Sequence, residues 1–97
     1  MNDPKKTLED SRKSIDAITR EMVRLIRKRD LVVRKVIEAK RQLGIPALNA
    51  VREKALIRKA RDMAEKAGVD PLLMEKITRL IIDNSRKYEE SSLKKAR

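Results

Sequence analysis

The feature that most constrains this fold is a long stretch, from Leu8 to Leu43, that contains neither proline nor glycine. Within it, apolar residues recur at the first and fourth positions of a seven-residue repeat, the period of a helix that packs along another helix. The first positions are Leu8, Ile15, Met22, Arg29, Val36 and Leu43, and the fourth positions are Ser11, Ile18, Leu25, Val32 and Ala39. This pattern predicts one continuous helix over about residues 7–43, which Gly44-Ile45-Pro46 then ends.

Two shorter helices are predicted to follow. Asn49 is a favourable N-cap and Gly68 a favourable stop, so the second helix should occupy about residues 50–67. Asp70-Pro71 predicts the start of a third helix over about residues 71–91, with a polar tail to residue 97. The expected apolar stripes are Leu56, Ala60, Met63, Ala64 and Ala67 on the second helix, and Leu73, Ile77, Leu80, Ile81, Asn84 and Tyr88 on the third. We therefore expect an all-α fold in a single domain over residues 1–97.

The first helix is too long to be covered by its own chain. At 1.5 Å per residue it spans roughly 54 Å. A compact domain of 97 residues is only roughly 30–35 Å across. The two shorter helices can cover one side of the long helix, and the rest of its apolar seam requires another chain. The sequence therefore predicts an intertwined homodimer with paired long helices.

Composition removes several kinds of chemistry. The chain has no cysteine and no histidine, which excludes disulfides, zinc sites built from these residues, thiol nucleophiles and histidine proton transfer. The net charge of +11, from 26 Lys and Arg against 15 Asp and Glu, predicts an anionic partner: nucleic acid, an acidic membrane or a small metabolite. Basic residues are dispersed among acidic ones, and Tyr88 is the sole aromatic residue. Both observations argue against nucleic acid.

No targeting or membrane segment is predicted. The start of the chain, residues 1–6, lacks the apolar run of a signal peptide, and no apolar stretch approaches the roughly 20 residues that span a bilayer. We expect a cytoplasmic protein that binds no membrane.

Three basic residues on the long helix raise the question of a site. Arg29 occupies a seam position, where it either sets the register of a coiled coil or points into an anion pocket. Lys40 returns to nearly the same face eleven residues later, so that Arg29, Val33, Val36 and Lys40 form one stripe. Two cations around an apolar middle suit a compact ligand with separated anionic groups, although Lys40 could also extend from the edge of the seam into solvent. Arg12 is too far along the helix to share a pocket with Arg29 of its own chain.

Polar residues also stand at the edge of the third helix. Ile81, Ser85 and Glu89 follow one another at intervals of four residues, which places them on one face. A hydroxyl and a carboxyl in this position either complete a polar pocket or mark the solvent edge of the helix.

Taken together, these residues resemble the all-α chorismate mutases, which are intertwined homodimers. The resemblance extends from about Leu8 to Glu89 and depends on the order of several short segments. These are Ser11-Arg12-Lys13-Ser14-Ile15-Asp16-Ala17-Ile18, Leu25-Ile26-Arg27-Lys28-Arg29, Ala39-Lys40, Gly44-Ile45-Pro46 with Arg52-Glu53, and Leu80-Ile81-Ile82-Asp83-Asn84-Ser85.

The resemblance implies an isomerase that converts chorismate to prephenate, in aromatic amino-acid biosynthesis, by a Claisen rearrangement without metal or cofactor. Catalysis would consist of selecting the reactive conformer and stabilising charge that grows on the ether oxygen. The resemblance implies that Arg29, and Arg12 of the partner chain, bind the two carboxylates of chorismate. It further implies that Lys40 reaches the ether oxygen and that Glu53 accepts the ring hydroxyl. Arg52 and Ser85 would support binding, and Val36 and Ile82 would form the apolar walls of the pocket.

This chain departs from the family pattern at two positions. Glu89 stands where many bacterial members have Gln, so we expect it to act in its protonated form, because a carboxylate would repel a developing oxyanion. Activity should then fall as pH rises. Asn49 replaces the Asp that is common in the connecting loop, and little changes if the backbone makes that contact with substrate.

Three alternatives remain, of which the first comes from the family resemblance. An isochorismate pyruvate lyase would use the same fold and pocket for a related elimination. A basic helical nucleic-acid-binding protein would bind DNA or RNA with a steep dependence on salt. A purely structural coiled-coil module would leave the stripe of Arg29 and Lys40 unexplained.

Overall fold

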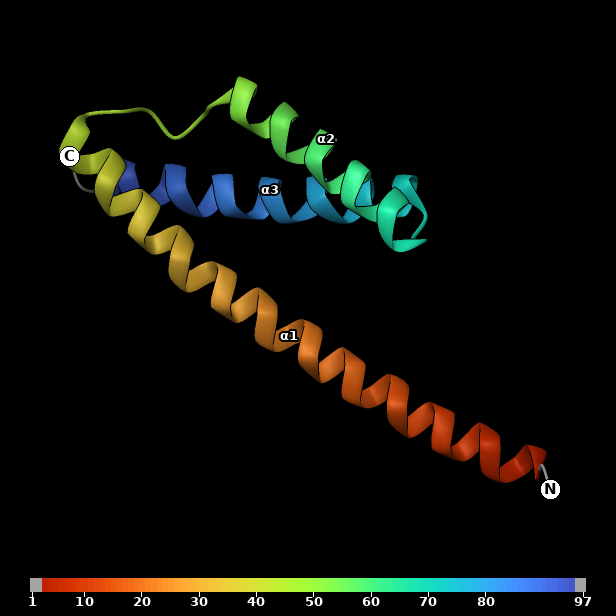
Figure 1. Ribbon diagram of the computed structural model, residues 1–97. Helices are drawn as coiled ribbons and strands as arrows, with labels where there is room; N and C mark the ends of the chain where they lie inside the picture. The colour runs from red at the N-terminus through yellow and green to blue at the C-terminus, as the bar shows by residue number, and fades with distance from the viewer. Residues whose placement is uncertain (1–2, 96–97) are drawn as a thin grey trace. The chain divides into compact units, whose positions relative to one another are not determined.

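The structure is a computed structural model that describes residues 3–95, and these residues form helices and connections without a strand. The helices are α1 (Pro4–Leu43), α2 (Ala50–Ala67) and α3 (Pro71–Lys95) (Figure 1). The predicted all-α fold of three helices is thus confirmed. The chain divides into two units, of which the first ends at Val32 and the second begins at Val33. The prediction of a single domain over residues 1–97 stays a prediction.

Two helix ends differ from the sequence-based prediction. Helix α1 begins three residues early because Asp3 caps it, accepting hydrogen bonds at Oδ1 from the amides of Lys5 (3.1 Å) and Lys6 (3.4 Å). Asp3-Pro4 is therefore the same start motif as Asp70-Pro71. Helix α3 continues to Lys95 instead of ending near Ser91. Leu93, Lys94 and Lys95 have good helix propensity, which allows the helix to continue past the two serines. Residues 96–97 of the expected tail lie outside the described residues.

The connections between helices follow the predicted capping residues. Gly44 and Gly68 have positive φ values of 68° and 74°, the left-handed conformation that glycine adopts without a steric penalty. At the first of these ends, the amide of Ile45 donates to the carbonyl of Lys40 at 2.9 Å. At the second, the amide of Val69 donates to the carbonyl of Ala64 at 2.8 Å. Both ends are thus Schellman motifs, which stop the helix and turn the chain back.

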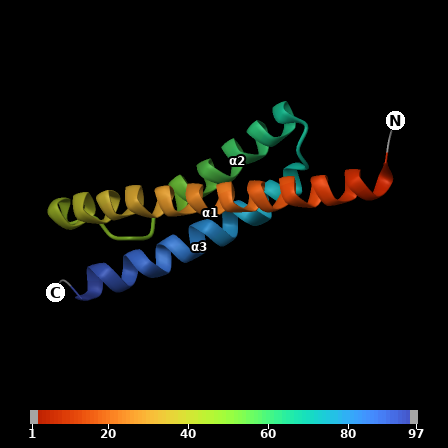
Figure 2. The same ribbon diagram turned by 90° about the horizontal axis from the view of Figure 1, so that it is seen from below.

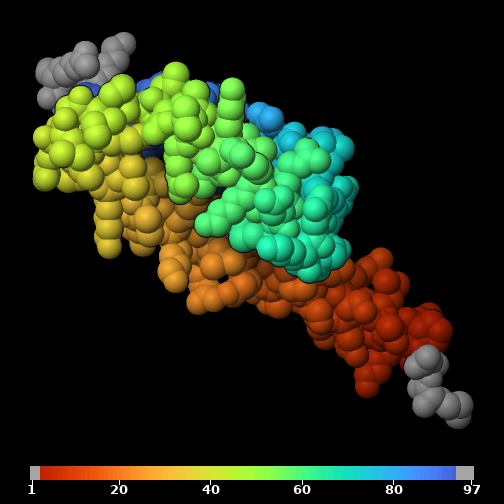
Figure 3. Space-filling view, turned by 45° about the horizontal axis from the view of Figure 1, so that its top comes forward, coloured from red at the N-terminus to blue at the C-terminus, as the bar shows by residue number. Residues whose placement is uncertain are grey.

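The first unit consists of α1 as far as Val32, and its apolar seam is open. Ile15 and Ile18 are each 59% exposed, and Leu25 is 54% exposed. The space-filling view in Figure 3 draws the first turns of α1 in red. The seam therefore offers an apolar strip of the kind that a helix of another chain covers.

The second unit contains the end of α1, the connection 44–49, α2 and α3. Helices α2 and α3 lie side by side in both Figure 1 and Figure 2. The buried apolar residues are Ile37 of α1, Ala60 and Ala64 of α2, and Ile82 of α3. Ala60 and Ala64 carry small side chains, and residues of this kind let packed helices approach closely.

The face of α3 that packs is not the predicted one. Leu73, Leu80 and Tyr88 are exposed, Leu80 by 71%, whereas Ile82 and Glu89 are buried. Apolar residues occur around much of α3, so its periodicity does not select a single face. Within the single chain the predicted stripe is therefore only partly covered: Ile77 and Ile81 are half-buried, and Asn84 is exposed like the three residues above.

An ion pair links α2 and α3 near their connection. Arg61 donates from Nη1 to Oε1 of Glu75 at 2.7 Å, and Arg79 approaches the other oxygen of Glu75 at 3.4 Å. The hydrogen bond from Arg61 is the main cause that lowers the pKa of Glu75 below its ordinary value. The same bond raises the pKa of Arg61.

None of the described helices is both long enough and apolar enough to cross a membrane.

Candidate active site

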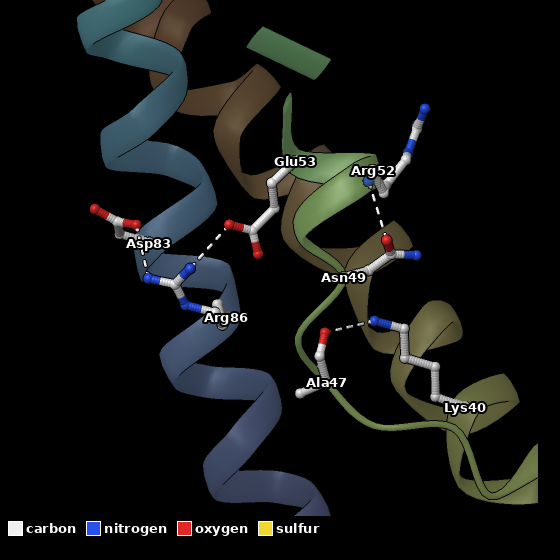
Figure 4. Close-up of polar contacts among 7 residues, drawn as sticks. All are labelled: Lys40, Ala47, Asn49, Arg52, Glu53, Asp83 and Arg86. Atoms are coloured by element: carbon white, nitrogen blue, oxygen red, sulfur yellow. Dashed lines mark hydrogen bonds and ion pairs between the residues drawn. The ribbon is translucent and has the colours of Figure 1, made fainter. Parts of the chain in front are cut away.

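Lys40 is the central cation of the second unit. It lies in the last turn of α1, and its side chain is 19% exposed. Nζ donates a hydrogen bond to the carbonyl of Ala47 at 2.9 Å (Figure 4). The Schellman motif at Gly44 turns the chain back on this helix end, which is how Ala47 comes within reach of the lysine of its own helix.

Glu89 is the buried acid of the second unit. It is 7% exposed, and its Oε1 lies 2.6 Å from Nζ of Lys40. Within the described residues this oxygen has no partner with the alignment of a hydrogen bond, so its contact with Lys40 is an electrostatic one. The pair joins the end of α1 to the last part of α3, two segments distant in sequence.

A second polar cluster lies between α2 and α3. Arg86 donates from Nη1 to Oε1 of Glu53 at 2.8 Å and from Nη2 to Oδ1 of Asp83 at 3.0 Å. Glu53 comes from the first turn of α2, and both other residues come from α3 (Figure 4). The side chains of Arg86 and Glu53 are 30% and 22% exposed, so their ion pair is partly shielded from water.

Asn49 and Arg52 occupy the start of α2. Oδ1 of Asn49 accepts a hydrogen bond from the backbone amide of Arg52 at 3.0 Å, which confirms Asn49 as the N-cap. The side-chain oxygen of Asn49 therefore already accepts a hydrogen bond from the first turn of α2. The side chain of Arg52 is exposed and points away from Lys40 (Figure 4).

The two residues that were expected to form apolar walls of the pocket, Ile82 and Val36, differ in their exposure. Ile82 is 6% exposed, whereas Val36, on α1, is 44% exposed. Ser85 is half-buried on α3, between Ile82 and Glu89 along the helix. Ile82, Ser85 and Glu89 follow at intervals of three and four residues, so they face the same side of α3.

The remaining two expected arginines belong to the first unit. Arg12 is exposed, and Arg29 is half-buried near the C-terminal end of that unit. The residues that the structure brings together are therefore Lys40 with Glu89, Asn49 with Arg52, and Glu53 with Arg86.

Sequence reasoning missed two of these partners. Arg86 could have been noticed, because it follows Asp83 by three residues and such a pair meets on a helix surface. Its contact with Glu53 depends on how α2 packs against α3, which the sequence pattern does not specify. The carbonyl of Ala47 carries no signal in the sequence, since every residue has one.

Nowhere between residues 3 and 95 do three or more acidic side chains gather as metal ligands.

Known proteins similar to this chain point to one family. The model of the family "Chorismate mutase type II" matches residues 11–90. The chorismate mutase of Methanocaldococcus jannaschii is 31% identical over 86 residues, which cover 89% of this chain and 87% of that protein. The T-protein of Haemophilus influenzae is 37% identical over 78 residues, which cover 80% of this chain and 21% of the T-protein. No solved structure matches the chain at a significant level.

The matched range contains all the polar clusters described above, from Arg12 in the first unit to Glu89 at the end of α3. Since the family match covers most of the chain, and the archaeal relative is similar across most of both proteins, this chain belongs to the type II chorismate mutase family.

Proposed function

We propose that the chain rearranges chorismate to prephenate at a site centred on Lys40, Glu89 and Glu53, completed by a second copy of the chain. Membership of the chorismate mutase family supports the reaction. The observation that carries the site is the buried pair of Lys40 and Glu89, whose Nζ and Oε1 atoms are 2.6 Å apart. The pair holds a cation and an acid together where both side chains are largely shielded from water.

The reaction makes modest chemical demands. One carbon–oxygen bond of the ether breaks while one carbon–carbon bond forms within the same molecule, and no proton is transferred. The enzyme has to hold the folded conformer of a dianion and to stabilise negative charge that grows on the ether oxygen. Cations and hydrogen-bond donors are sufficient for both tasks.

Lys40 and Glu89 are suited to the ether oxygen. The ammonium of Lys40 stays in place because the carbonyl of Ala47 accepts one of its hydrogen bonds at 2.9 Å. A donor held in advance costs no reorganisation as charge develops. Glu89 would act as a second donor in its protonated form, which requires bound substrate to separate its carboxyl group from Nζ of Lys40, since a carboxylate would repel the developing negative charge.

Binding of the two carboxylates is assigned to arginines. We assign them to Arg29 and to Arg12 of a second copy, because a planar guanidinium can bind a carboxylate through two parallel hydrogen bonds. Glu53 would accept the ring hydroxyl, with Ser85 and the backbone at Asn49 as further contacts. Arg52 would add positive charge, and Ile82 and Val36 would flank the ring.

The exposed seam of the first unit supports the homodimer. Leaving side chains such as Ile15, Ile18 and Leu25 in water forfeits about 25 cal/mol for each Å² of apolar surface that could be buried. A second long helix is the complement that this heptad pattern fits. The homodimer is therefore part of the proposal, and the cytoplasmic location stays a prediction.

The experiment is incubation of the purified chain with chorismate and detection of prephenate. Isochorismate is offered in parallel, and release of pyruvate from it would favour the lyase alternative. Failure to consume chorismate, at a concentration where the protein is folded and dimeric, would overturn the proposal.

A further inference from the structure

We propose that Arg86 is a positioning residue for substrate binding, because it fixes the orientation of Glu53. This inference rests on the proposed function, in which Glu53 accepts the ring hydroxyl of chorismate. Arg86 touches none of the substrate atoms in this account and acts through the carboxylate.

The geometry of Arg86 supports this role. Its two terminal nitrogens bind different carboxylates, with Nη1 at 2.8 Å from Oε1 of Glu53 and Nη2 at 3.0 Å from Oδ1 of Asp83. The guanidinium is planar, so fixing one nitrogen determines where the other points. Asp83, one turn earlier on α3, thereby anchors Arg86, and Arg86 in turn anchors Glu53 of α2 (Figure 4).

This arrangement divides the two oxygens of Glu53 between two tasks. Oε1 accepts the hydrogen bond from Arg86, which leaves Oε2 to accept the hydroxyl of a ligand. A glutamate without this contact would sample several rotamers, and ordering it would then oppose binding. The partial burial of both side chains also shields the pair from the screening that weakens exposed ion pairs.

A structural role is the competing explanation, because the same contact joins two helices. The chain offers a matched control in Arg61, which joins α2 to Glu75 of α3 at a similar distance of 2.7 Å. Arg61→Gln removes an interhelical ion pair without touching Glu53. A purely structural Arg86 should behave as Arg61 does.

The test is a double-mutant cycle on the full-length dimer, with kcat and KM for chorismate as the readout. Arg86→Gln should lower kcat/KM about tenfold in the wild-type background, because a hydrogen-bonding group displaced by a fraction of an ångström loses much of its effect. In the Glu53→Ala background the same change should alter kcat/KM by less than about twofold, since there is no carboxylate left to position. Arg86→Lys, which keeps the charge but not the fork, should fall between wild type and Arg86→Gln.

The outcomes separate this inference from the proposed function. The role of Arg86 would be overturned if Arg86→Gln lowered kcat/KM equally in the wild-type and Glu53→Ala backgrounds, or if Arg61→Gln lowered kcat/KM as much as Arg86→Gln does. Neither outcome would affect the proposed function, provided that the wild type converts chorismate. A wild type that leaves chorismate unchanged would overturn both. Circular dichroism of each variant identifies those that fail to fold. If Arg86→Gln is among them, Arg86→Lys takes its place in the double-mutant cycle with Glu53→Ala.

Discussion

At the scale of single residues, the two acids of the candidate site differ in their cationic partners. Glu89 is buried against the ammonium of Lys40, and Glu53 is half-buried against the guanidinium of Arg86. An ammonium attracts a carboxylate without imposing a direction on it, whereas a planar guanidinium fixes direction as well as charge. The pair of Lys40 and Glu89 therefore suits a position where substrate replaces one of the two partners. The pair of Arg86 and Glu53 suits a hydrogen-bond acceptor whose direction is fixed.

A pH–rate profile tests the proposed part played by Glu89. If this acid donates to the ether oxygen in its protonated form, wild-type kcat should fall as pH rises, because the ionised form repels the developing charge. Glu89→Gln donates at every pH, so its profile should be flatter. Glu90→Gln, at the exposed neighbouring position, is the matched control and should retain the wild-type slope. Equal slopes for wild type and Glu89→Gln would contradict the assignment.

The residues of the site were predictable to different extents. Lys40 was singled out by its place on the same helix stripe as Arg29, and the roles of Glu53 and Glu89 came from the family resemblance. Arg86 was missed because its main contact joins positions that are far apart in sequence. Such a contact depends on the packing of two helices, and periodicity within each helix does not determine it.

At the scale of secondary-structure elements, capping residues predicted the helix ends more reliably than any other feature of the sequence. Gly44, Asn49 and Gly68 act as the sequence predicted, because each satisfies backbone groups locally. The start of α1 lies three residues before its predicted position because Asp3 caps the helix. The end of α3 lies beyond its predicted position, at Lys95. The buried face of α3 was also missed, because several of its faces are apolar.

Substitution of Gly44 tests how much the helix end contributes to stability. Gly44→Ala should lower the free energy of unfolding by about 1–2 kcal/mol, because alanine is strained in the left-handed conformation. The φ value is 68° and nothing within 4 Å would contact an added Cβ, so the cost comes from the backbone alone. Chemical denaturation measures this change, with the exposed helical position Lys59→Ala as control. An unchanged midpoint for Gly44→Ala would contradict the account.

The pairing of α2 with α3 should weaken in acid. The hydrogen bond from Arg61 keeps the pKa of Glu75 below its ordinary value in the folded chain, so the folded state favours the ionised form. Its stabilising contribution is therefore present at neutral pH and is lost as pH falls through the folded pKa.

The measurement is the melting temperature as a function of pH. Between about pH 5 and pH 3 the wild type should lose more stability than Glu75→Gln, which cannot titrate. Glu90→Gln should follow the wild type. The difference should be small and should shrink in high salt, as for any accessible ion pair. Parallel curves for wild type and Glu75→Gln would show that the pair does not contribute.

At the scale of the whole molecule, the proposed active site depends on a second copy of the chain. The length of the proline- and glycine-free stretch predicted this need before any contact was known, because a helix of that length exceeds what its own chain can cover. The exposed seam residues, such as Ile18 and Met22, agree with it. How the two copies cross is beyond what a heptad pattern specifies, since the same seam fits several pairings.

The most direct test of the account is a subunit-mixing experiment with two inactive variants. Arg12→Ala and Lys40→Ala should each abolish turnover, because every site in either homodimer lacks one cation. After the subunits exchange, half of the dimers carry one variant chain of each kind, and each of these has one intact site. The mixture should therefore recover about a quarter of wild-type activity, as the two-fold symmetry of the dimer requires. No recovery, despite exchange demonstrated by a tagged chain, would show that Arg12 and Lys40 of different chains do not form one site.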